Sequence, residues 1–184
     1  MKQDGQADVV APGRVFWITG LPGSGKSTLA GELYSCVRRV TPAVVRVDGD
    51  EFRVIMGNDL GKDPDGRVKN AFRIARTCRW LSSQGIHVVC ATVSLYRDVH
   101  TWNRENMQNY TEILVEASLE ARRGRDTKGL FTRPGQAGEL GVDHPFDLPA
   151  RPDHIVKNDG SVQDLRGIAQ TLVKRLAELA GGTR

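Results

Sequence analysis

Short runs of apolar residues, rich in valine and isoleucine, recur along the chain and are separated by longer segments of mixed polarity. Apolar runs of about four to eight residues are typical of strands that are buried on both faces of a parallel sheet. The second run ends at Asp48. The predicted strands cover residues 15–19, 44–47, 86–93, 112–116 and 154–156.

Between these runs, apolar residues recur every three or four positions, which is the period of a helix with one buried face. In the last such segment, Leu165, Leu172 and Leu179 share one stripe, which predicts core packing or, as the alternative, a helix that binds a partner. The predicted helices cover residues 26–37, 67–84, 99–108, 119–124 and 162–180.

Strands that alternate with helices predict an α/β fold, a parallel sheet with helices on both faces. The 184 residues suit one domain, which we expect at residues 14–184 after a flexible tail at residues 1–13. Ligands of such folds bind outside the carboxyl ends of the strands. Gly20, Asp48 and Ser94 fall at those ends, so we expect the chemistry there.

Composition narrows the class of protein further. No apolar run approaches the ~18 residues of a membrane span, so we expect no membrane partner. Cys36, Cys78 and Cys90 lack metal-ligand spacing, and residues 1–10 lack a signal-peptide core; together these predict free thiols in a cytoplasmic protein. A net charge of +4 would suit an anionic substrate or a nucleic acid, but is more often a property of the solvated surface.

Residues 20–27 read Gly-Leu-Pro-Gly-Ser-Gly-Lys-Ser, a complete GxxxxGK[ST] pattern between a predicted strand and a predicted helix. Such a loop turns its backbone N–H groups toward a phosphate chain, and the helix N-terminus adds positive charge. Lys26 would reach the β- and γ-phosphates and Ser27 would bind Mg²⁺, whereas the alternative is a plain glycine turn. The predicted ATP-binding residues of the loop are Gly20, Leu21, Pro22, Gly23, Ser24, Gly25, Lys26, Ser27 and Thr28.

Asp48-Gly49-Asp50 follows the second predicted strand. Phosphoryl transfer needs Mg²⁺, positive charge on the moving group and a carboxylate that orients or deprotonates the attacking hydroxyl. Asp50 is placed to be that base, and Asp48 could contact the Mg²⁺ shell through water. The alternative is a simple Asp-Gly turn.

Arginine and asparagine side chains next to this stretch indicate an anionic acceptor. Arg67, Asn70 and Arg73 are spaced by three and share one helix face, and Arg53 and Arg97 are further candidates. Arginine binds anionic oxygens with a planar fork of donors. A solvated helix face explains the same spacing and stays open as the alternative.

Residues 125–152 are rich in glycine, proline and charge and show no clear period. A segment of this length inside a compact domain is usually functional, and next to a phosphate site it predicts a lid. Arg125 and Lys128 would then neutralise the transferred phosphate, and the alternative is a surface loop. The four histidines show no ligand spacing, and no guanine-reading Asn-Lys-x-Asp motif is present.

Together these motifs resemble the adenylyl-sulfate kinase family, which phosphorylates the ribose 3′-hydroxyl of adenylyl sulfate with MgATP. The resemblance covers nearly all of residues 15–156. Its motifs are the loop at residues 20–28, Asp-Gly-Asp-x-x-Arg at 48–53, Asp-Leu-Gly at 59–61, Ser-Leu-x-Arg at 94–97 where the family has Ser-Pro-x-Arg, and the lid stretches 125–131 and 138–146.

The resemblance implies a P-loop kinase fold, Mg²⁺ as the metal, ATP and a nucleotide as partners, no nucleic acid, and a homodimer as in many family members. It implies Asp50, Lys26 and Lys128 as catalytic residues and adds Arg125 to the ATP site. The implied acceptor-binding residues are Asp48, Arg53, Arg67, Asn70, Ser94, Arg97 and Lys128.

The departures from the family pattern concern the acceptor. The family clamps adenine between two aromatic rings, but this chain has Lys62 after Asp-Leu-Gly and runs Glu139-Leu140-Gly141 where the second ring is expected. A stacked base contributes on the order of 1–3 kcal/mol, so adenine binding should be weaker. Gly66 stands where the family has aspartate, and Phe72 where it has arginine.

Residues 52–61 and 102–106 are similar to a divergent branch that phosphorylates cytidine diphosphoramidate for surface-polysaccharide modification. Three hypotheses follow. The first is a nucleotide 3′-hydroxyl kinase with adenylyl sulfate as the family's default acceptor. The second has cytidine diphosphoramidate as the acceptor. The third is a nucleotide-binding regulator without transfer activity.

Overall fold

The computed structural model describes residues 10–125 and 146–181, of which residues 175–181 are described by their backbone alone. At its centre lies a five-stranded sheet in the order β2-β3-β1-β4-β5, and every neighbouring pair is parallel. This confirms the predicted α/β fold. The strands are β1 (Val15–Thr19), β2 (Val44–Asp48), β3 (His87–Ala91), β4 (Tyr110–Glu116) and β5 (His154–Lys157).

The helices follow the predicted segments with one addition, a short helix that begins directly after Asp48. The Asp48 side chain accepts a hydrogen bond from the Asp50 backbone N–H and so caps this helix. The sequence analysis placed Asp48-Gly49-Asp50 after the second predicted strand, with an Asp-Gly turn as the alternative, and did not predict this helix. The helices are α1 (Lys26–Val40), α2 (Gly49–Ile55), α3 (Pro64–Ser83), α4 (Arg97–Asn106), α5 (Leu119–Gly124) and α6 (Val162–Gly181).

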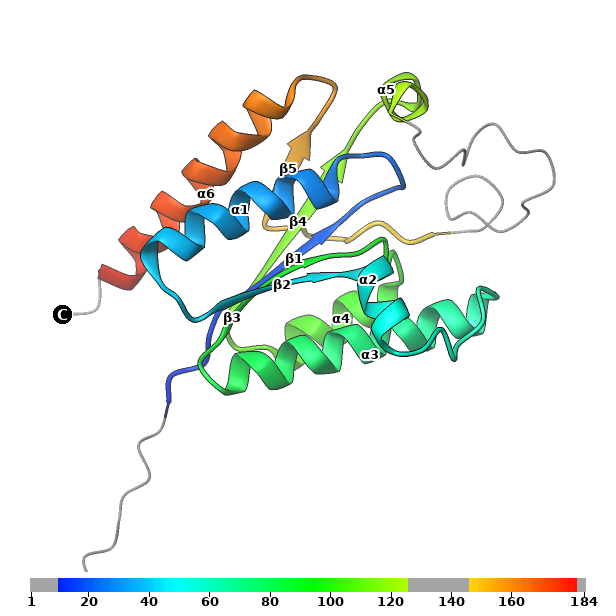
Figure 1. Cartoon of the computed structure of the whole chain (residues 1–184), viewed down its shortest axis with the longest axis horizontal. Coiled ribbons are helices and arrows are strands. Elements are labelled where there is room, and N and C mark those ends of the chain that lie inside the picture. Colours follow the sequence, from blue (N-terminus) through cyan, green and yellow to red (C-terminus); the bar gives the residue numbers. More distant parts are fainter. Residues whose placement is uncertain (1–9, 126–145, 182–184) are drawn as a thin grey trace, which may run out of the picture.

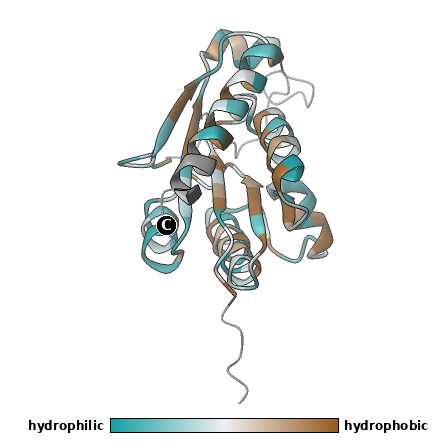
Figure 2. Cartoon of the chain, turned by 90° about the vertical axis from the view of Figure 1, so that its left-hand side faces the viewer, coloured by the Kyte–Doolittle hydropathy of each residue, from teal (hydrophilic) through white to brown (hydrophobic). Residues whose placement is uncertain are grey.

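Helices cover both faces of the sheet. Helices α1 and α6 lie side by side on one face, and α2, α3 and α4 cover the other (Figure 1). Side chains alternate along β1, so that Phe16 and Ile18 pack under α1 and α6 while Val15 and Trp17 pack under α3 and α4. The strands therefore carry mostly hydrophobic residues, whereas the covering helices are hydrophobic on one side and polar on the other (Figure 2).

The chain before β1 is held against the sheet from Pro12 onward. Asn109 Nδ2 donates to the Pro12 carbonyl oxygen at 2.8 Å, and the buried Gly13 exchanges hydrogen bonds with Ser82. Pro12 and Gly13, which were predicted to end a flexible tail, thus belong to the packed structure. The three cysteines are free and buried. Within the described ranges, no helix combines the length and apolar character that crossing a membrane requires.

Candidate active site

A cleft of about 680 Å³ opens at the carboxyl ends of β1, β2 and β3. The loops that follow these strands form its walls, together with the first turns of α2 and α3. The predicted site residues that line it are Pro22, Gly23, Gly25, Lys26, Ser27, Thr28, Asp48, Asp50, Arg53, Arg67, Asn70, Ser94 and Arg125.

Five predicted residues of the described ranges do not line this cleft: Gly20, Leu21 and Ser24, which belong to the phosphate loop, and Arg97 and Arg73. Arg97 begins α4 with a side chain that is 80% exposed, and it lies 3.6 Å from an Asp147 carboxylate oxygen. Arg73 forms a bidentate ion pair with Asp59 at 2.7 and 2.9 Å. The spacing placed Arg73 on one face with Arg67 and Asn70, but it cannot reveal a partner from another segment. Lys128 lies outside the described residues.

The loop at residues 20–25 is built on glycines that other residues could not replace. Gly25 has a φ of 97°, which side chains rarely adopt, and a β-carbon there would collide with the Asn158 side-chain amide. Asn158 follows β5, is buried, and donates from Nδ2 to the Ser24 carbonyl oxygen at 2.8 Å. The sequence analysis missed Asn158, although its position after a strand is the signal that marked Asp48.

Lys26 is buried at the start of α1, with 8% of its surface exposed. Its Nζ donates to the Leu21 carbonyl oxygen at 2.9 Å, so the ammonium group is held within the curve of the loop. An ammonium placed among inward-turning backbone N–H groups creates a strongly positive site, which suits the phosphate chain of a nucleotide.

Ser27 and Asp48 join the loop after β1 to the end of β2. Ser27 Oγ donates to Asp48 Oδ2 at 2.8 Å, while Asp48 Oδ1 accepts from the Asp50 backbone N–H at 3.0 Å. The Asp50 residue is exposed and lines the cleft. A hydroxyl and a carboxylate are hard oxygen ligands that fit Mg²⁺, which takes most of its remaining ligands from water and phosphate.

Arg53 and Arg67 form the cationic wall of the cleft, and both are held by backbone carbonyls. Arg53 Nη1 donates to the Leu60 oxygen at 2.7 Å and to the Gly61 oxygen at 3.2 Å. Arg67 Nε donates to the Lys62 oxygen at 2.6 Å. Fixed guanidinium forks of this kind are suited to an anionic group on a ligand.

Tyr96 is an aromatic residue in this wall that the sequence analysis missed. Burial raises the pKa of its phenol above the ordinary value, while the charges of Arg67 and Arg53 act in the opposite direction. The phenol and the two guanidinium groups are therefore close enough to interact. Beside them, Ser94 Oγ lies 2.7 Å from Thr92 Oγ1 in a buried hydrogen bond.

Arg125, at the predicted lid entry, lines the cleft from its far side. Its Nη1 donates to the Asn158 carbonyl oxygen at 2.8 Å and its Nη2 to the Gly160 oxygen at 3.0 Å. Arg122, one turn earlier, also lines the cleft, and burial lowers the pKa of its guanidinium. Arg125, where the predicted lid would begin, is thus tied to the strand end that supports the phosphate loop.

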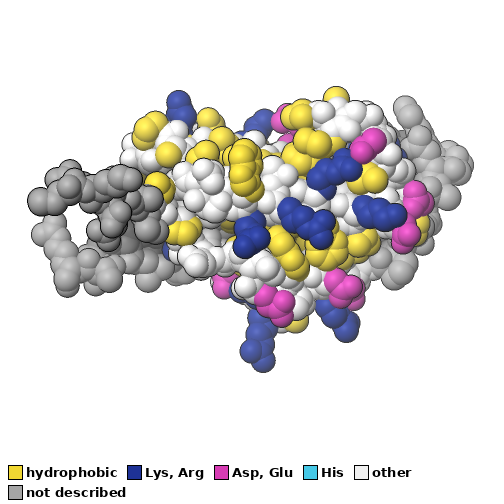
Figure 3. Space-filling view, turned by 90° about the horizontal axis from the view of Figure 1, so that it is seen from below, with side chains coloured by type: hydrophobic (Ala, Val, Ile, Leu, Met, Phe, Trp, Pro, Cys, Tyr) yellow, Lys and Arg dark blue, Asp and Glu magenta, His cyan; other side chains and the backbone are white. Residues whose placement is uncertain are grey.

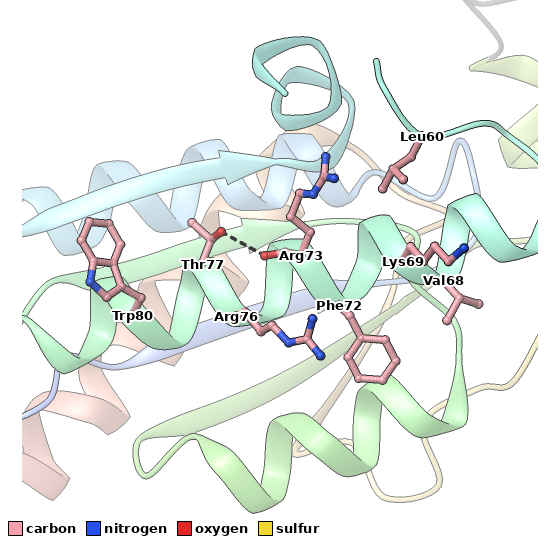
Figure 4. Close-up of a pocket in the computed structure, with 8 residues that line it drawn as sticks. All are labelled: Leu60, Val68, Lys69, Phe72, Arg73, Arg76, Thr77 and Trp80. Carbon is pink, nitrogen blue, oxygen red and sulfur yellow. Dashed lines mark hydrogen bonds between the residues drawn. The ribbon is translucent and has the colours of Figure 1, made fainter. Parts of the chain in front are cut away.

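A second, more open hollow of about 630 Å³ lies on the outer side of α3. Lys and Arg side chains alternate with hydrophobic ones on this side of the molecule (Figure 3). Arg73 points toward the segment that carries Leu60, whereas Phe72 points away toward α4, where its ring meets Trp102 edge-on (Figure 4). Leu60 lines this hollow while its neighbours Asn58 and Lys62 line the cleft, so this segment lies between the two.

Comparisons with known proteins agree with this geometry. A family profile described as Adenylylsulphate kinase matches residues 12–157. The adenylyl-sulfate kinase of Deinococcus deserti is 37% identical over 172 residues, which cover 91% of this chain and 93% of the relative. The cytidine diphosphoramidate kinase of Campylobacter jejuni is 32% identical over 166 residues, which cover 89% of this chain and 96% of the relative.

Solved structures give the same result. The Mycobacterium tuberculosis APS kinase, solved in complex with AMPPNP and APS, superimposes with a TM-score of 0.79 and 27% identity over 90% of this chain and 98% of that one. A gluconokinase from Sinorhizobium meliloti shares the fold, with a TM-score of 0.63 at 17% identity over 95% of this chain and 99% of that one. The chain therefore belongs to the adenylyl-sulfate kinase family of P-loop kinases, phosphotransferases that act on a hydroxyl group.

Proposed function

We propose that the protein transfers the γ-phosphate of MgATP to the ribose 3′-hydroxyl of a nucleotide that carries a second anionic group. The observation that supports this is a single cleft lined by the phosphate loop, by Asp50, and by two arginines held by backbone carbonyls. One side of the cleft suits the phosphates of ATP, and the other suits an anionic acceptor.

The Asp50 carboxylate takes the proton of the 3′-hydroxyl, and the freed oxygen forms a bond to the γ-phosphorus. The bond from that phosphorus to the bridging oxygen breaks, and its electron pair leaves with ADP. Lys26 stabilises the charge on the phosphates, and Lys128 adds charge from the lid. Ser27 and Asp48 would hold Mg²⁺, which when bound neutralises phosphate charge.

Two acceptors are candidates. Adenylyl sulfate is the default of the family, as in the relative from Deinococcus deserti. Cytidine diphosphoramidate is favoured by the acceptor wall itself, where the exposed Lys62 replaces an aromatic ring and Tyr96 is the one aromatic among the described lining residues. The relative from Campylobacter jejuni carries the name of that activity.

The deciding experiment is a coupled assay of ADP release with MgATP, in which each nucleotide is offered separately. Saturable turnover with one nucleotide identifies the acceptor. Asp50→Asn should lower kcat about a hundredfold or more, because the hydroxyl loses its base. Glu51→Gln is the matched control, since Glu51 is the neighbouring carboxylate and lies 3.5 Å from Arg46 on the surface.

A nucleotide-binding regulator is the alternative from another class. Tight binding of ATP without ADP release in the presence of either nucleotide would replace the kinase proposal with that one. We also propose a reducing, cytoplasmic location, because Cys36, Cys78 and Cys90 are free thiols. Reaction of all three with a thiol reagent after the purified protein is unfolded without reductant would support this location.

A further inference from the structure

The wall that carries Arg53 and Arg67 rests on the loop at residues 58–62. The carbonyl oxygens of Leu60, Gly61 and Lys62 are the acceptors that hold the two guanidinium groups. The side chains of these three residues make none of those hydrogen bonds. The position of the loop backbone therefore sets the position of both cations.

An ion pair anchors this loop to α3. Arg73 donates to both carboxylate oxygens of Asp59, at 2.7 and 2.9 Å. This hydrogen bonding lowers the pKa of the Asp59 carboxyl below its ordinary value. Arg73 lines the second hollow, on the outer side of α3, and points toward the segment that carries Leu60 (Figure 4). Arg73 therefore holds the loop and does not contact the ligand site directly.

A close backbone contact anchors the loop at its other end. Gly66, in the first turn of α3, is so near the loop that a β-carbon there would overlap the Gly61 carbonyl oxygen and lie 2.9 Å from the Gly61 carbonyl carbon. Both neighbours are backbone atoms, so a side chain at position 66 would have to move the loop. Asp63 fixes the same turn by accepting from the Gly66 N–H at 3.0 Å.

We propose that Gly66 and the Asp59–Arg73 pair are positioning residues for the acceptor nucleotide. They hold the 58–62 loop against α3, and the loop in turn aims Arg53 and Arg67 at the anionic group of the acceptor. The inference rests on the proposed function. It also makes residue 66 a determinant of specificity, because the aspartate expected there from the family resemblance does not fit beside this loop.

Gly66→Ala and Gly66→Asp test the contact directly. Each should raise KM for the accepted nucleotide about tenfold or more, because charged hydrogen bonds to the loop carbonyls are displaced, while KM for MgATP stays within about twofold. Gly167→Ala is the matched control, since Gly167 is also a helical glycine and a β-carbon there has no neighbour within 4 Å. Unchanged acceptor KM in both variants, or an equal rise for both substrates, would overturn the proposal.

The ion pair is tested by Asp59→Asn and by the exchanged pair Asp59→Arg with Arg73→Asp. Asp59→Asn should raise acceptor KM with little change in the KM for MgATP, and the exchanged pair should restore much of the loss. A role in folding alone would instead lower the melting temperature and leave the ratio of the two KM values unchanged, and that result would contradict a positioning role.

Amide hydrogen exchange separates this proposal from the proposed function. If the loop is held as inferred, residues 58–62 exchange faster in Gly66→Ala than in Gly167→Ala, without any substrate present. If the wild-type protein phosphorylates neither nucleotide, the proposed function fails while the exchange measurement still tests the anchoring. Equal exchange rates in the two variants would show that Gly66 does not hold the loop.

Discussion

At the scale of single residues, the site was predictable where a local pattern carries the chemistry. The phosphate loop and Asp48-Gly49-Asp50 have fixed spacings, and all the backbone turns that they need lie within a few residues. Tyr96 and the true partner of Arg73 depend on segments that meet only in the folded chain, whereas Asn158 could have been found from its position after a predicted strand. No spacing within one helix could have shown that Asp59 holds Arg73.

His87 gives a residue-scale prediction on pH. Burial, together with the charge of Arg14, lowers the pKa of His87 below its ordinary value of 6.5, and its Nδ1 accepts a hydrogen bond from the Arg14 backbone N–H at 3.0 Å. The contribution of neutral His87 to the free energy of unfolding is therefore fully present above pH 6.5. It is lost as the pH falls through the pKa of His87 in the folded state.

The measurement is urea unfolding of the wild type and His87→Asn at pH 7.5 and pH 5. Asparagine keeps an acceptor oxygen but does not titrate. The free energy of unfolding of His87→Asn should therefore fall less between the two pH values than that of the wild type. The same fall in both proteins would rule out His87 as a source of acid sensitivity.

At the scale of elements, the strands were predictable because strands covered on both faces need continuous apolar runs. The sequence pattern predicted that β4 begins at residue 112, two residues too late, since Tyr110 and Thr111 are polar. Helix α2 was missed because Gly49 and Asp50 at its start are weak helix formers, and the Asp48 cap and the packing of Phe52 outweigh that weakness. Such tertiary support is not visible in a short window of sequence.

A buried charge network joins α4 to β4 and gives a prediction on stability. Glu112 on β4 is 1% exposed and accepts hydrogen bonds from Arg104 of α4 at 2.9 Å and from Tyr110 at 2.9 Å, with His100 Nδ1 at 2.7 Å. Glu112→Ala should lower the free energy of unfolding by about 3–5 kcal/mol, because the change leaves buried partners unpaired.

Chemical denaturation measures that loss. Glu116→Ala is the control on the same strand, because Glu116 is exposed and its removal should change the free energy of unfolding by less than about 0.5 kcal/mol. A loss of the same small size for Glu112→Ala would mean that the network contributes nothing to joining α4 and β4.

At the scale of the whole molecule, ligand binding should be visible as stabilisation. Saturating Mg²⁺ and AMPPNP, at about a hundred times the dissociation constant, should add about 2.7 kcal/mol and raise the melting temperature by about 5–10 °C. Lys26→Ala should lose this shift because the ammonium in the phosphate loop is absent. Lys174→Ala, on the exposed side of α6, should keep it. An equal shift in both variants would place the nucleotide elsewhere.

The strand order affects folding during translation. The central strand β1 is the first to leave the ribosome, yet Val15 pairs with Val88 on one side and with Tyr110 on the other. The segment Val-Phe-Trp-Ile-Thr, which is fully buried in the finished molecule, thus has no sheet partner until about half of the chain, up to Ala91, has been synthesised. During translation it is an exposed apolar segment of the kind that chaperones bind. The strand that is fully buried in the folded protein is therefore a segment of the nascent chain at risk of aggregation.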